Sequence, residues 1–123
     1  MRLAVLLALG AWNLTGCAPP HPRVTPQFRL DCDQGYDALA RQIATLPGIQ
    51  LARAPGEPYH YFNSEDGQTS YVLTLPGGAG HPAIIQQRST KQGMADVGCA
   101  FGDKAGYNLL LTYLKSLAGA RQR

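Results

Sequence analysis

The sequence predicts an α+β fold, a small two-layer sandwich with an N-terminal helix, an antiparallel sheet of three or four strands and a C-terminal helix. Three observations predict it. Apolar residues recur at helical spacing near both ends of residues 28–119. Segments rich in β-branched and aromatic residues lie between these ends, and an Asp-Gly pair typical of a hairpin separates two of them. We expect both helices to cover the same face of the sheet.

The first helix is expected to begin near Gln34, because the side chain of Asp33 can accept hydrogen bonds from the unpaired N–H groups of a first turn. Its apolar residues follow helical spacing: Tyr36, Leu39, Ala40, Ile43 and Leu46. Pro47 and Gly48 then end it, since both disfavour a continuing helix.

The last helix is expected to follow Asp103, which is suited to cap it. Its apolar face has a clear 3.6-residue period: Tyr107, Leu110, Leu111, Leu114 and Leu117. Gly119 is expected to end this helix. Residues 120–123 would then form a short basic tail, which could be weakly attracted to an anionic membrane surface.

The segments between the helices alternate between strand-like and turn-like composition. The expected strands are a short one at 49–53, an aromatic one at 59–63 and further ones at 69–75, 83–88 and 95–101. The segment 64–68 is read as a hairpin turn, and the glycine-rich segment 76–82 as a loop. The order α, several strands, α leads to an antiparallel sheet.

The composition limits the classes of partner. The chain has 123 residues, 45% hydrophobic and 15% charged, with a formal net charge of +3. This is enough for one small domain with a real core. The basic residues are scattered and form no run or stripe, so we expect no nucleic-acid partner.

The first sixteen residues have the pattern of an export signal. Arg2 provides a positive charge, and the apolar stretch 3–9 that follows is too short to span a bilayer as a helix. Leu14-Thr15-Gly16-Cys17 then resembles the lipobox of bacterial lipoproteins, a Leu and two small residues before the cysteine that receives the lipid. The alternatives are an ordinary cleaved signal peptide with a chance cysteine and a buried N-terminal helix.

The resemblance implies that residues 1–16 are removed and that Cys17 becomes the lipidated N-terminus, carrying a diacylglyceryl group and usually a further acyl chain such as palmitate. Ala18 follows it, and the absence of Asp there implies the outer membrane rather than the inner one, with the domain facing the periplasm. Residues 17–27 contain four prolines and are expected to form an extended tether between the membrane and the domain.

Two further cysteines remain once Cys17 is assigned to the lipid. Cys32 and Cys99 are an even pair in an oxidising compartment, and we expect a disulfide between them. Two free thiols or a redox pair are the alternatives, although a redox pair is more often a Cys-x-x-Cys motif, which the sequence lacks.

No motif in the sequence carries recognisable chemistry. The loop 76–81 is followed by neither the lysine nor the helix of a phosphate-binding loop. His60 and Ser64 lie near acidic residues, but a catalytic triad is assembled by folding and cannot be read from this order. We therefore expect no enzyme, no cofactor and no metal site.

The sequence suggests a contact surface built from aromatic residues and the glycine-rich loop. Its candidate residues are Tyr59, Tyr61, Tyr71, Gly78 and His81. The expected function is a small accessory or protein-interaction module of the cell envelope with an envelope protein as partner. The alternatives are a periplasmic inhibitor or ligand-binding lipoprotein, for example one that inserts the loop 77–81 into a lysozyme, and, with less support, a small hydrolase.

Overall fold

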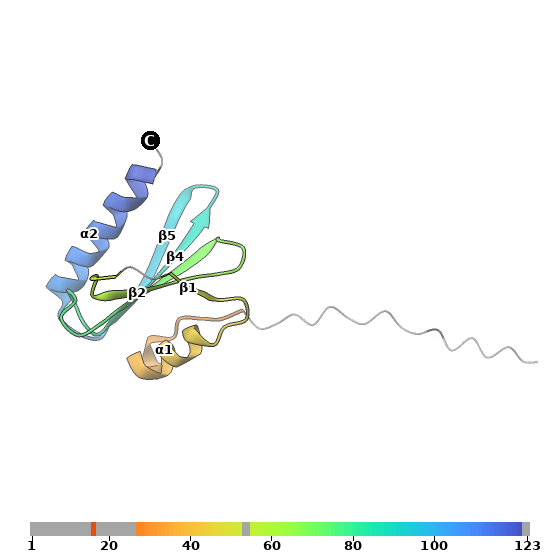
Figure 1. Ribbon diagram of the computed structural model, residues 1–123, viewed down its shortest axis with the longest axis horizontal. Coiled ribbons are helices and arrows are strands. Elements are labelled where there is room, and N and C mark those ends of the chain that lie inside the picture. Colours follow the sequence, from red (N-terminus) through yellow and green to blue (C-terminus); the bar gives the residue numbers. More distant parts are fainter. Residues whose placement is uncertain (1–15, 17–26, 53–54, 122–123) are drawn as a thin grey trace, which may run out of the picture.

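The computed structural model describes residue 16, residues 27–52 and residues 55–121 (Figure 1). The expected signal peptide and nearly all of the expected tether, including Cys17, lie outside these residues. The described elements follow one another along the chain: η1 (Cys32–Gln34), α1 (Tyr36–Ala44), β1 (Gln50–Ala52), β2 (Tyr59–Asn63), β3 (Thr69–Thr74), β4 (Ala83–Thr90), β5 (Gly93–Ala100) and α2 (Lys104–Arg121).

The five strands form one antiparallel meander in the order β1-β2-β3-β4-β5, so each strand pairs with its neighbours in the chain. The predicted α+β class and the order helix, sheet, helix are confirmed. The sheet has five strands rather than three or four, because the short segment at 50–52 pairs with β2. Strands β4 and β5 are longer than expected and meet in a tight turn after Thr90.

The predicted hairpin between β2 and β3 is also confirmed. The Ser64 backbone N–H donates to the Thr69 carbonyl at 2.9 Å and closes the turn. The Asp66 carboxylate accepts from the Ser64 hydroxyl at 2.6 Å and from the Gln68 N–H at 2.9 Å. These two hydrogen bonds lower the pKa of Asp66, so its charged form holds the turn together.

The two helices cover opposite faces of the sheet, so the expectation that they share one face, in two layers, is wrong (Figure 1). Leu39 and Ile43 of α1 pack in one core cluster with Leu73. Leu110 of α2 packs in a second cluster with Val72. Successive strand residues point to opposite faces, so β3 carries apolar side chains on both faces and a helix packs on each. The molecule therefore has three layers: α1, the sheet and α2.

The first helix begins differently from the expectation. The Asp31 carboxylate, rather than Asp33, accepts a backbone hydrogen bond, from the Asp33 N–H at 3.0 Å, and it caps the short 3-10 turn η1. Helix α1 then begins at Tyr36, after Gly35. The chain therefore turns once before the helix, which brings Cys32 toward the sheet.

The second helix is capped as predicted: the Asp103 carboxylate accepts from the Gly106 N–H at 2.8 Å. It does not end at Gly119, because the helical backbone continues to Arg121 and Gly119 has no positive φ. Half of the expected basic tail 120–123 is thus part of the helix.

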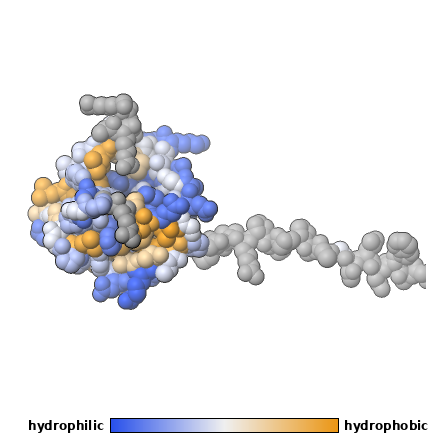
Figure 2. Space-filling model, viewed as in Figure 1, coloured by the Kyte–Doolittle hydropathy of each residue, from blue (hydrophilic) through white to orange (hydrophobic). Residues whose placement is uncertain are grey.

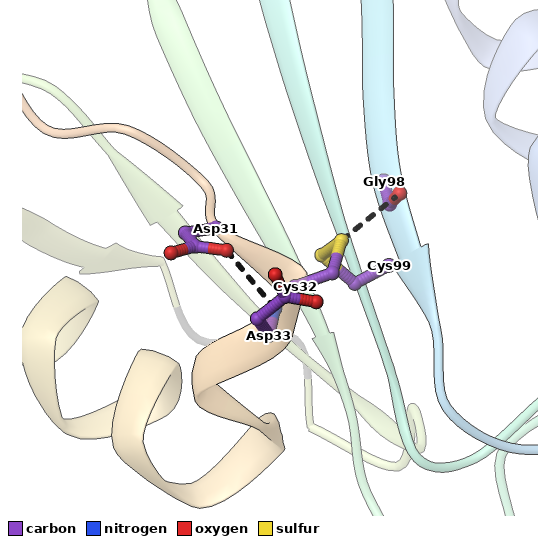
Figure 3. The surroundings of a disulfide bond; sticks show 5 residues. All are labelled: Asp31, Cys32, Asp33, Gly98 and Cys99. Atoms are coloured by element: carbon purple, nitrogen blue, oxygen red, sulfur yellow. Dashed lines mark hydrogen bonds between the residues drawn. A yellow bond between two sulfur atoms is a disulfide. The ribbon is translucent and has the colours of Figure 1, made fainter.

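The predicted disulfide between Cys32 and Cys99 is present, with Cα atoms 5.5 Å apart (Figure 3). Cys99 is 2% exposed and belongs to the α1 core, whereas Cys32 is exposed. Cys32 Sγ lies 3.7 Å from the Gly98 carbonyl oxygen. The bond ties the segment before α1 to strand β5 across a sequence separation of 67 residues.

Candidate binding site

The sheet face under α2 consists of two parallel rows of side chains with different chemistry. Strand pairing places one residue from each strand in a first, mostly apolar row: Ala52, Tyr61, Val72, Ile85 and Gly98. Two positions along each strand lies a second row, which we call the polar row: Gln50, Asn63, Ser70, Gln87 and Asp96. Residues two apart on a strand share a face, so both rows face α2.

Helix α2 covers the centre of the apolar row and leaves much of the polar row open. Leu110 and Leu114 pack on Val72 and Ile85, and all four side chains are at most 3% exposed. A groove of about 560 Å³ then opens between the later turns of α2 and the polar row. Its volume lies in the range typical of small-ligand sites, roughly 300–1,000 Å³.

The floor and walls of this groove differ in polarity. The floor contains amides and hydroxyls, among them Asn63, Gln68, Ser70, Gln87 and Ser89. The wall on the helix side is apolar and aromatic: Tyr113, Leu114, Leu117 and Ala118, with Met94 opposite on β5. A mainly apolar wall beside a few polar groups is the usual composition of a binding pocket.

Hydrogen bonds hold the side chains of the polar row in place and, among the described residues, leave one amide atom of Asn63 and one of Gln87 free to bind a ligand. The Ser70 hydroxyl donates to the Asn63 side-chain oxygen at 2.8 Å. The Gln87 amide nitrogen donates to an Asp96 oxygen at 3.4 Å. Within the described part of the chain, no protein group pairs with the Asn63 amide nitrogen or the Gln87 amide oxygen. The groove floor therefore offers an oriented donor and an oriented acceptor without a formal charge.

Tyr61 lies at the border between the two rows. Burial raises the pKa of Tyr61, and a hydrogen bond to the Glu57 carboxylate together with its negative charge raises it further. The phenol therefore keeps its proton at neutral pH. Its ring meets the ring of Tyr59 edge to face, with centroids 6.3 Å apart, which fixes the position of Tyr61 in the groove.

The structure does not bring the three candidate tyrosines together. Tyr59 and Tyr61 are half-buried on the α2 side. Tyr71 is 5% exposed and packs in the α1 core, edge to face with Phe28 at 5.6 Å. Only Tyr61 of the three lines the groove, because Tyr71 occupies an opposite-facing position in its strand.

Gly78 and His81 belong to a loop that packs onto the start of α2. Gly80 is buried, and a Cβ atom there would stand 2.5 Å from the Tyr107 nitrogen. The His81 ring contacts Tyr36 edge to face, and its Nδ1 lies 2.9 Å from the Thr74 hydroxyl. The loop therefore packs against both helices through Gly80 and His81, while Pro76 and Gly77 at its tip are exposed.

Of the two histidines that the structure describes, His60 and His81, neither is hydrogen-bonded to an accessible nucleophile. Thr74 is fully buried, and its hydroxyl also accepts from the Ala83 N–H at 2.8 Å, so the pair with His81 is structural. The Ser64 hydroxyl holds the β2–β3 turn through Asp66. Within residues 27–52 and 55–121, no group of three or more His, Cys, Asp or Glu side chains could hold a metal ion.

The groove could not be found from the sequence alone. Asn63, Ser70 and Gln87 alternate with apolar neighbours and resemble ordinary solvent-facing strand residues. They become neighbours only through the strand register, which is a long-range property.

No protein-family model, no curated protein and no solved structure matches this chain. Among the described residues, no helix is both long enough and apolar enough to cross a membrane.

Proposed function

We propose that this protein is a lipoprotein anchored through Cys17 in the outer membrane, facing the periplasm, and that its domain is an accessory binding module of the envelope. The observation that carries the proposal is the sequence Leu14-Thr15-Gly16-Cys17, four residues after the short apolar run 3–9. Each buried methylene of an acyl chain contributes about 0.8 kcal/mol, so two or three chains make a stable anchor.

The disulfide supports this location. Disulfides form and persist in oxidising compartments such as the periplasm, and they are rare where thiols are kept reduced. The Cys32–Cys99 bond joins two segments that are distant in the sequence, with one sulfur buried in the core. Such a bond suits a structural role in an exported domain.

The groove between α2 and the polar row supports the binding role. Its lining combines open hydrogen-bonding groups with Tyr113, which is 39% exposed. The groove favours a ligand-binding lipoprotein over an inhibitor that inserts a loop, because the loop 76–82 packs against Tyr107. The exposed apolar side chains form several separate patches among polar ones in the view of Figure 2, rather than one broad docking surface.

Removal of the lipidated cysteine tests the anchor. Cys17→Ala should accumulate as an uncut precursor or lose its diacylglyceryl group, and the chain should leave the detergent-requiring membrane fraction. The matched control is Cys32→Ala, which also replaces a cysteine, here one of the disulfide pair, but should stay anchored. Unchanged, detergent-requiring membrane association of Cys17→Ala would refute the proposal.

Site-specific photo-crosslinking in the native host tests the binding role. A benzophenone amino acid at Tyr113 points its reactive group at the groove lining, whereas the same amino acid at Leu109, which is 68% exposed on α2, lies outside that lining. The proposal expects one defined adduct with an envelope component from position 113 only. Equal labelling from both positions, or none from 113, would count against the groove as the binding site.

A further inference from the structure

We propose that the groove between α2 and the polar row binds a neutral oligosaccharide. This inference rests on the proposed binding role and adds the class of ligand. It follows from the open amide groups of Asn63 and Gln87, from the tyrosines that border the groove and from the pairing on both sides of β2, β3 and β4, which supply most of its floor.

The polar row matches the hydrogen-bonding pattern of a sugar. A sugar hydroxyl donates and accepts, and an acetamido group offers one N–H and one carbonyl oxygen. The Asn63 amide nitrogen can donate to such an oxygen, and the Gln87 amide oxygen can accept from a hydroxyl or an N–H. Because Ser70 and Asp96 already hold the other ends of these two amides, their open ends are oriented before any ligand arrives.

The walls match the apolar side of a sugar ring. The C–H groups on one face of a pyranose pack against aromatic rings, and tyrosine combines a large ring with a polar tip. Tyr113 of α2 and Tyr61 of β2 both line the groove, from the helix side and from the sheet side respectively. Leu117 and Met94 add apolar surface for the remaining C–H groups.

The charge of the lining favours a neutral ligand. Among the described residues of the groove lining, Glu57 is the only one with a charged side chain, and its nearby carboxylate contributes to the raised pKa of Tyr61. The described part of the lining contains no Lys, Arg or His to attract a phosphate, sulfate or carboxylate group. An anionic ligand would lose its hydration without gaining an opposite charge.

The sheet topology favours a sugar over a peptide. Extended peptides bind sheets by adding a strand to a free edge, where main-chain N–H and C=O groups are open. Strands β2, β3 and β4, which supply most of the groove floor, are each paired on both sides. The part of the floor that these three strands form therefore offers a ligand its side chains. A volume of about 560 Å³ suits a short oligosaccharide of roughly two or three rings.

Titration of the ¹⁵N-labelled full chain, purified in mild detergent, tests the inference. The probes are N-acetylglucosamine trimer, maltotriose and triglycine. We expect at least one of the two saccharides to bind with a Kd of about 1 mM or tighter. Its amide shift changes should concentrate around Asn63, Gln87 and Tyr113. No shift with either saccharide, shifts elsewhere on the domain, or stronger binding of triglycine at the same residues would overturn the inference.

Three variants locate the binding. Asn63→Leu removes the open donor and Tyr113→Ala removes an exposed aromatic wall, and each should weaken saccharide binding by about tenfold. The matched control is Asn108→Leu, which makes the same change at an exposed position of α2 outside the groove and should bind as the unchanged protein does. Circular dichroism and the thermal midpoint identify any variant that loses its fold. Equal affinity in a folded Tyr113→Ala variant would overturn the inference.

The outcomes separate this inference from the proposed function. If Cys17→Ala releases the chain and the crosslink at position 113 yields a protein, the anchored binding module stands and the saccharide inference falls. If saccharides bind in the groove while Cys17 carries no lipid, the inference stands and the anchor falls.

Discussion

The phenol of Tyr107 lies so close over Gly98 that a Cβ atom at residue 98 would stand 2.0 Å from the Tyr107 oxygen. The same Cβ atom would be 2.9 Å from the Ile84 carbonyl oxygen. Gly98 belongs to the apolar row of the sheet, and Tyr107 lies in the first turns of α2. The absence of a side chain at Gly98 therefore sets how closely the helix approaches β5.

Gly98→Ala should lower the free energy of unfolding by about 1–3 kcal/mol, because either Tyr107 or the strand must move. Adding Tyr107→Phe, which removes the clashing oxygen, should recover part of the loss. The control is Gly119→Ala, at a helical position with no atom within 4 Å of its Cβ. It should raise stability by about 0.5–1 kcal/mol through helix propensity. Urea denaturation measures all four proteins, and an unchanged stability of Gly98→Ala would contradict the close contact.

Loss of the disulfide should cost about 4 kcal/mol, as the chain-entropy model gives for a loop of this length. Cys32→Ser and the double variant Cys32→Ser/Cys99→Ala should lose nearly the same amount, because both remove one shared bond. Cys99→Ser should lose more, since it also places a hydroxyl in the α1 core, where Cys99 is 2% exposed. Urea denaturation with and without reductant checks this. Additive losses from the two sites would show that the bond does not stabilise the domain.

Stability should fall at alkaline pH. Burial raises the pKa values of Tyr36, Tyr61, Tyr71 and Tyr107 above the ordinary tyrosine value of about 10. The folded state therefore binds these phenol protons more tightly than the unfolded state does. These phenols make their full contribution to the free energy of unfolding below about pH 10, the pKa of a tyrosine in the unfolded state. That contribution is lost as the pH rises through their higher pKa values in the folded state.

Urea denaturation at a series of pH values should show this loss beginning near pH 10. Tyr61→Phe should make the decline less steep, because it removes one of the four phenols and keeps its ring. A Tyr61→Phe protein with the same slope above about pH 10 would contradict the assignment of Tyr61 as one of the groups responsible.

Substitutions in the glycine-rich loop should separate packing from backbone strain. Gly77 and Gly80 have φ values of +93° and +75°, so alanine is strained at both. Nothing lies within 4 Å of a Cβ at Gly77, whereas a Cβ at Gly80 would meet the Tyr107 nitrogen at 2.5 Å. Gly77→Ala should cost about 1 kcal/mol, and Gly80→Ala about 1–3 kcal/mol more. Equal thermal shifts would mean that the loop does not pack on α2.

The local features of the fold could be predicted from the sequence because they depend on neighbouring residues. The apolar period of α2, its Asp103 cap and the β2–β3 hairpin each need only a few adjacent residues. The side of the sheet that each helix covers depends on the whole strand. The consecutive apolar residues Tyr71-Val72-Leu73 are typical of a strand buried on both faces, and the expectation of a shared face did not use that signal.

The candidate site is harder to predict because it depends on register and on helix placement. The cysteine count, once Cys17 was assigned to the lipid, predicted the Cys32–Cys99 pair. The polar row needs the alignment of Asn63, Ser70 and Gln87 across three strands, and a shift of one residue would turn a whole strand over. The groove also needs α2 to stop covering the sheet after Leu114, which no local pattern specifies.

The intact mass of the mature protein, purified from membranes of its own host, tests the central claim most directly. The account predicts a chain that begins at Cys17, with the mass of a diacylglyceryl group and a further acyl chain and with two hydrogens fewer for the Cys32–Cys99 bond. A mass that retains residues 1–16, or a chain with an unmodified thiol at Cys17, would contradict the lipid anchor.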